Sequence, residues 1–125
     1  MRVRWKSILL SAVAAAVALP PSAWANYFCQ GSIDQVGVNP DGSVIVLSSQ
    51  ASLSYITLCS VSTAVNNGVY SISTDTCKGM LATVLRAQAT GATVQWGFTD
   101  SLVCSGHTAY QQLTGLYWGP IVQTE

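Results

Sequence analysis

The sequence predicts a small, mainly β domain with one helix, held together by disulfides. Most of the chain consists of short runs rich in Val, Ile, Ser, Thr and Tyr, separated by Gly, Pro and Asn, as is typical of β-strands and turns. Residues 76–90 depart from this pattern, because their apolar side chains recur at helical spacing. Half of the residues are hydrophobic and only 8% are charged, which argues against a disordered chain.

The first strands form a predicted meander. Residues 28–38 alternate apolar and polar side chains, but the apolar positions change faces partway, so we expect a bulge or bend near Gly31 or Gly37. The next segments predict a turn and two strands from their Pro and Gly content and their β-branched and aromatic side chains; they are residues 39–42, 43–47 and 52–59.

The single helix follows a polar loop at residues 66–68. Ser73 or Thr74 can cap its N-terminus, and Gly91 is placed to end it. Asp75 in the first turn and Arg86 near the end both suit the helix dipole. The face expected to be buried consists of Cys77, Met80, Leu81, Val84 and Leu85.

Further strands are predicted after the helix. Residues 93–98 alternate, and their apolar side, Val94, Trp96 and Phe98, is expected to face the core. We expect residues 101–105 and 115–123 to form a last hairpin or an edge, and Pro120 favours the edge position.

This order of elements is that of an OB-fold. A three-strand meander, one helix and then further strands predict a small, partly open barrel whose helix lies between strands three and four. Four cysteines allow three disulfide connectivities. Because Cys59 ends strand three and Cys77 opens the helix, we expect these two to pair, which leaves Cys29 on strand one for Cys104.

Several short motifs resemble the OB-fold B subunits of toxins such as subtilase cytotoxin and pertussis toxin. The similarity comprises a G-x-I opening strand, a glycine-turn hairpin, a cysteine closing strand three and a helix running into A-x-G-x-x-V, at residues 31–34, 41–44, 58–61 and 89–94. The resemblance implies a small secreted bacterial protein that acts as a non-catalytic binding module for surface glycans or a partner protein. It leaves open whether the chain forms a homo-oligomer.

The N-terminus predicts export. Arg2, Arg4 and Lys6 precede an apolar run at residues 8–19, and an Ala-x-Ala site ends at Ala25, which is the layout of a secretory signal peptide. About a dozen apolar residues are too few for a transmembrane span, which needs roughly 20. We therefore expect residues 1–25 to be removed, and residues 26–125 to form a single secreted or periplasmic domain with no membrane span.

Charge and motifs exclude several functions. After removal of residues 1–25, only Lys78 and Arg86 are cationic, too few to bind the phosphates of a nucleic acid. Cys104 and His107 form a lone C-x-x-H pair, and no motif indicates a metal or a cofactor. His107 is the only histidine and lacks a nucleophile motif around it, so we expect no catalytic residues.

The remaining acids offer one catalytic alternative. Asp34 and Asp100 are the only candidate acid pair for glycoside hydrolysis, and nothing in the sequence brings them together. The alternative function is therefore a small secreted hydrolase or an enzyme inhibitor.

Aromatic and amide side chains give the main indication of binding. They are densest at residues 110–118, where adjacent aromatics on a strand are expected to face opposite sides, so that one of them is exposed. An ordinary surface tyrosine is the competing interpretation. The predicted binding residues are Gln111, Gln112, Thr114, Tyr117 and Trp118.

Overall fold

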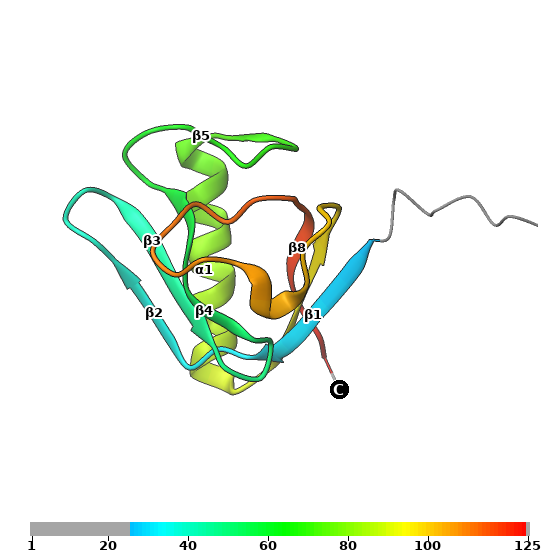
Figure 1. The fold of residues 1–125 in the computed structure, drawn as a ribbon. Helices are drawn as coiled ribbons and strands as arrows, with labels where there is room; N and C mark the ends of the chain where they lie inside the picture. Colours follow the sequence, from blue (N-terminus) through cyan, green and yellow to red (C-terminus); the bar gives the residue numbers. More distant parts are fainter. Residues whose placement is uncertain (1–25, 125) are drawn as a thin grey trace, which may run out of the picture.

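The computed structural model describes residues 26–124, and the predicted signal peptide, residues 1–25, lies outside the described residues. Within these residues the chain forms short strands and one long helix (Figure 1). The elements in order are β1 (Tyr27–Ser32), β2 (Gln35–Val38), β3 (Ser43–Ser48), β4 (Leu53–Ser60), β5 (Val65–Asn66), β6 (Ser71–Ile72), α1 (Thr74–Thr90), β7 (Thr93–Phe98), the 3₁₀ turn η1 (Cys104–Gly106) and β8 (Leu116–Val122).

Two antiparallel three-stranded sheets make up most of the fold, which confirms the mainly β prediction. Their strand orders are β1-β7-β8 and β2-β3-β4, and β5 and β6 form a small separate hairpin. The segment predicted as one bent strand, residues 28–38, is two strands, β1 and β2, which belong to different sheets. A parallel bridge between Thr57 and Gln112 links β4 to the segment before β8. Pro120 lies on β8, at the edge of its sheet, as predicted.

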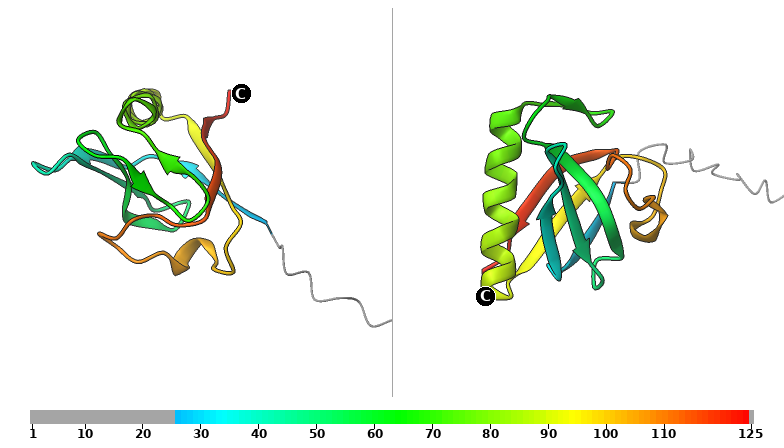
Figure 2. Two further views of the ribbon diagram at one scale, coloured as in Figure 1. Left: turned by 90° about the horizontal axis from the view of Figure 1, so that it is seen from above. Right: turned by 90° about the vertical axis from the view of Figure 1, so that its left-hand side faces the viewer.

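Helix α1 lies along one side of both sheets (Figure 2) and contacts β2, β4, β7 and β8. The Ser73 side chain caps its N-terminus by accepting from the Thr76 N–H, and Gly91 ends it with φ of 68°. Cys77 and Val84 are buried as expected, but Leu85 is 45% exposed, so its predicted burial is wrong. The buried face of α1 runs from Cys77 through Val84 to Ala87. Leu85 projects from a different side of the helix and therefore stays exposed.

The core is formed by the inward side chains of both sheets. Val94, Trp96 and Phe98 have no exposed surface, as their alternation predicted. Val44 and Val46 of β3 are equally buried, whereas the residues between and after them are only partly covered. This alternation leaves a second set of β3 side chains on the outer face of the β2-β3-β4 sheet.

Two disulfides fix the elements to one another. Cys59 of β4 is joined to Cys77 of α1, and Cys29 of β1 is joined to Cys104 of η1, the same pairing expected from the sequence. Residues 101–105 do not form the expected strand.

Local hydrogen bonds fold residues 100–106 into a turn and a 3₁₀ helix instead. The Asp100 carboxylate accepts from the Leu102 N–H at 3.0 Å, and the Gly106 N–H donates to the Val103 carbonyl at 2.8 Å. No helix in the described range 26–124 has the length and apolar character required to cross a membrane.

Candidate functional site

The predicted binding stretch, residues 110–118, divides between two parts of the fold. Its first residues run beside β4, where the Tyr110 N–H donates to the Tyr55 carbonyl and the Leu113 N–H donates to the Thr57 carbonyl, both at 2.8 Å. Its last residues belong to β8, in the other sheet. The structure therefore does not bring the five predicted residues together in one place.

The polar members of the prediction differ in their environments. Gln111 and Thr114 are exposed. The Gln112 side chain is partly buried and donates to the Leu58 carbonyl at 3.0 Å and to the Leu113 carbonyl at 3.2 Å. Its amide N–H groups thus tie the loop to β4, so Gln112 has a structural role.

Tyr117 and Trp118 do not face opposite sides, contrary to expectation. Gly97 pairs with Trp118 and Phe98 pairs with Leu116, so Tyr117 is an extra residue in a β-bulge. Because the bulge breaks the alternation, both rings approach Phe28, at centroid distances of 6.5 Å for Tyr117 and 5.9 Å for Trp118. Trp118 is 39% exposed and Tyr117 is half-buried.

The outer face of the other sheet carries a second aromatic group. The rings of Tyr55 on β4 and Tyr110 in the 99–115 loop are stacked, with centroids 5.5 Å apart and planes within 10° of each other. Both residues have left-handed backbones, with φ of 48° and 61°. This conformation is uncommon for bulky side chains and costs free energy, and such strain concentrates at functional sites. Tyr110 is 68% exposed.

A hollow of about 270 Å³ adjoins this stacked pair. Ile45 and Leu47 reach it because they alternate with the buried Val44 and Val46 on β3. None of the lining residues is charged, so the hollow combines apolar side chains with two phenol rings and the amides at its margin. The lining consists of Gln35, Val36, Gly37, Asn39, Ile45, Leu47, Tyr55 and Tyr110.

His107 and Asp100 meet at the start of β1, through Tyr27. The Tyr27 hydroxyl donates to the Asp100 carboxylate and lies 2.9 Å from His107 Nε2. Since a phenol has one hydrogen, His107 must donate to the Tyr27 oxygen, which places a proton on Nε2. Gly115 leaves room for the carboxylate, because a Cβ there would lie 2.5 Å from Asp100 Oδ2.

The electrostatics of this cluster do not activate a nucleophile. Burial raises the pKa of Tyr27 far above its usual value, and the hydrogen bond and negative charge of Asp100 raise it further. Burial lowers the pKa of His107, and the Asp100 charge partly offsets this effect. Tyr27 is therefore a neutral phenol, and the cluster joins β1 to the 99–107 segment.

Asp34 and Asp100 do not form an acid pair. Asp34 accepts hydrogen bonds from the Ser49 N–H at 2.7 Å and the Ser49 hydroxyl at 2.6 Å, which hold its pKa below the usual range. It follows the end of β1, whereas Asp100 bonds Tyr27 at the start of that strand. Six strand residues span about 20 Å, beyond the carboxylate separations used in glycoside hydrolysis.

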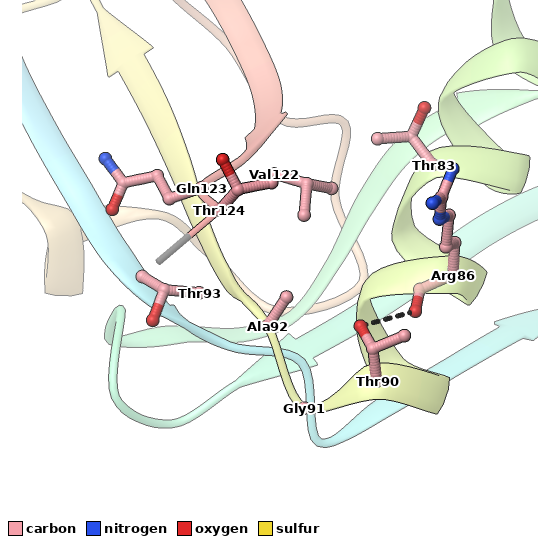
Figure 3. A pocket seen from close by; sticks show the side chains of 9 residues that line it. All are labelled: Thr83, Arg86, Thr90, Gly91, Ala92, Thr93, Val122, Gln123 and Thr124. Atoms are coloured by element: carbon pink, nitrogen blue, oxygen red, sulfur yellow. Dashed lines mark hydrogen bonds between the residues drawn. The ribbon is translucent and has the colours of Figure 1, made fainter.

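A larger hollow, about 660 Å³, lies at the C-terminal end of α1 (Figure 3). Its lining includes Arg86 and several threonines, and the Thr90 hydroxyl donates to the Arg86 carbonyl at 3.0 Å. It lies at the end of the helix where the dipole disfavours anions, and no aromatic ring lines it. These features suit it less well to a ligand than the hollow beside Tyr110.

Residues 26–124 contain no group of three or more His, Cys, Asp or Glu side chains placed to hold a metal ion. Comparisons of the chain with protein-family models, with curated proteins and with solved structures found no match. Sequence reasoning missed Tyr55 and Tyr27, neither of which lies in a motif. The aromatic density at 110–118 was the one signal that included Tyr110.

Proposed function

We propose that this chain is a non-catalytic binding module that holds a neutral, ring-shaped ligand, such as a sugar of a surface glycan, on the rings of Tyr55 and Tyr110. The observation that carries the proposal is the stacked pair itself, held in two left-handed conformations beside a hollow. An exposed phenol face stacks on the apolar face of a sugar ring. Gln35 and Asn39 at the margin supply hydrogen bonds that orient its hydroxyls.

We further propose an OB-fold-like barrel as the architecture. The connectivity supports it: β1 and β2 replace one long first strand shared by both sheets, and α1 lies between the third and fourth strands of the barrel. OB-folds bind ligands on the face of their second and third strands and in the adjoining loops. Those strands correspond to β3 and β4 here, and Tyr55 and Tyr110 lie on that face and in such a loop.

Binding is favoured over hydrolysis by the environment of the polar groups. The imidazole of His107 and the carboxylate of Asp100 both bond to Tyr27. No residue that lines the Tyr55–Tyr110 hollow carries a carboxylate, an imidazole or a thiol. Export with cleavage after Ala25, a secreted or periplasmic location, a toxin-B-like assembly and a homo-oligomer stay predictions from the sequence.

The test is a glycan-array screen of the purified protein, followed by titration of the best oligosaccharide against the Tyr110→Gly variant. Affinity should fall about tenfold or more, because the stacking face is lost. Stability should change little, because relief of the left-handed strain, about 1 to 2 kcal/mol, offsets the lost ring stacking, about 0.5 to 1.5 kcal/mol.

Tyr70→Ala is the matched control, since Tyr70 is also an exposed tyrosine, at 56%, but does not line this hollow. It should bind the oligosaccharide as the wild type does. A folded Tyr110→Gly protein with unchanged affinity would show that the stacked pair is not the site.

A further inference from the structure

The outer face of the β1-β7-β8 sheet is ordered in rows by the strand register. Phe28 lies opposite Gly97, and Gly97 lies opposite Trp118, so these three form one row. Gln30, Gln95 and Ile121 form the next row in the same way. Along β1 and β7 successive outward positions are two residues, or about 6.7 Å, apart. On β8 a register shift separates Trp118 and Ile121 by three residues. Ser32 and Thr93 pair in a third row.

Gly97 makes the first row an aromatic surface. A Cβ at this position would lie 3.0 Å from the Phe28 ring, 3.1 Å from Trp118 Cβ and 3.2 Å from the Tyr117 ring. The absence of a side chain therefore lets the rings converge over the middle strand. Phe28 is 49% exposed and Trp118 is 39% exposed, so the rings still present surface to solvent.

The second row presents amides beside the rings. Gln123 donates to the Gln95 side-chain oxygen at 2.9 Å, which orients Gln95 and leaves its NH₂ group directed to other acceptors. The exposed Gln30 side chain has no hydrogen-bond partner within residues 26–124. None of the three strands contains a charged residue.

We propose that this face binds an extended neutral polysaccharide, whose sugar rings stack on Phe28 and Trp118 and whose hydroxyls bond to Gln30 and Gln95. The absence of charge excludes an anionic ligand held by ion pairs. Aromatic rings followed by amides match a ligand that alternates apolar ring faces with hydroxyl groups. A sheet face, unlike a hollow, suits a chain of sugars, and it is a separate surface from the Tyr55–Tyr110 site.

A second copy of the chain is a poorer occupant. A stable protein interface uses roughly 20 to 30 residues from each partner. The outward positions of the three strands are far fewer, and they include one glycine: Phe28, Gln30, Ser32, Thr93, Gln95, Gly97, Tyr117, Trp118 and Ile121.

Retention of the purified protein on insoluble cellulose, chitin and mannan tests the proposal. At least one polysaccharide should retain the wild type, and Trp118→Ala and Gln30→Ala should each weaken retention at least several-fold. Gln30→Ala is informative even if Trp118→Ala unfolds, because an exposed side chain without internal bonds is not needed for stability. Leu85→Ala, which changes an exposed apolar residue on α1, is the matched control and should be retained normally.

The outcomes separate this proposal from the one above. Loss of retention in Trp118→Ala and Gln30→Ala, with Tyr110→Gly retained, supports the face even if the array detects nothing. No retention of the wild type on any of the three polysaccharides overturns it, as does normal retention of both variants. If sedimentation instead shows a dimer that Trp118→Ala dissociates, the face is a self-association surface and the proposal is wrong.

Discussion

Gly31→Ala, which adds one methyl group to β1, should destabilise the folded protein strongly. A Cβ at Gly31 would lie 2.6 Å from the Ala51 backbone nitrogen and 2.6 Å from Gln50 Cβ, so the backbone of the 49–52 turn must move. Such overpacking costs about 1 to 3 kcal/mol.

Movement of that turn also disturbs hydrogen bonds to β1. Ser48 donates its hydroxyl to the Ser32 carbonyl at 2.7 Å, and the Ser32 N–H donates to the Gln50 side chain at 3.1 Å. Each such bond contributes about 0.5 to 1.5 kcal/mol. Together with the overpacking, we expect Gly31→Ala to lower the free energy of unfolding by about 2 to 4 kcal/mol.

Gly37→Ala is the matched control on β2. A Cβ there would have no neighbour within 4 Å. The change should be neutral or stabilise the protein by about 0.4 to 1 kcal/mol, because alanine restricts the unfolded chain.

Urea unfolding of both variants measures the difference, and thermal melting checks it. For a domain of this size, each kcal/mol shifts the Tm by about 4 to 8 °C. If Gly31→Ala proved as stable as Gly37→Ala, the close approach of the 49–52 turn to β1 would be wrong.

Two further predictions concern the disulfides and pH. Changing Cys29 and Cys104 to alanine should lower the free energy of unfolding by about 4.5 kcal/mol, and changing Cys59 and Cys77 by about 3 kcal/mol, because the closed loops span 75 and 18 residues. Urea titrations check both, and wild-type stability in either variant would contradict the argument. Burial lowers the pKa of His107, so its contribution to stability is complete above its ordinary pKa of about 6.5 and is lost as pH falls through the folded-state value. Melting between about pH 7 and pH 5 should show this loss, and His107→Gln should show a smaller one.

The sequence predicts the regular elements well where one periodicity dominates. Residues 93–98 alternate strictly, and the structure buries their apolar side completely. The helix ends are predictable because they depend on single residues: the Ser73 side chain accepts a hydrogen bond from a backbone N–H, and Gly91 adopts a left-handed conformation. The strand predicted at residues 101–105 is wrong. Their composition suits a strand, but a hydrogen bond to the Asp100 side chain and a 3₁₀ turn bend the backbone there.

The candidate site is less predictable because it depends on contacts between distant segments. Tyr55 and Tyr110 meet only because the 110–113 segment bonds to β4, and no local pattern predicts that contact. Both tyrosines also adopt left-handed backbone conformations, which bulky residues rarely adopt, so no propensity argument predicts them. The bulge at Tyr117 is similar: one unpaired residue breaks the alternation, so that Tyr117 and Trp118 both approach Phe28, and only the register with β7 reveals it.

The pairing of β1 has a consequence for the order of folding. Strands β2, β3 and β4 follow one another and can pair as soon as they are made, whereas β1 pairs with β7, with Tyr27 opposite Phe98. Closing so long a loop is slower than forming a meander. We therefore expect β1 to pair later than the β2-β3-β4 meander, and Cys29 to remain a free thiol until β1 has paired with β7. If oxidation precedes that pairing, Cys29 can join Cys59 or Cys77, and the native disulfides then form by thiol–disulfide exchange.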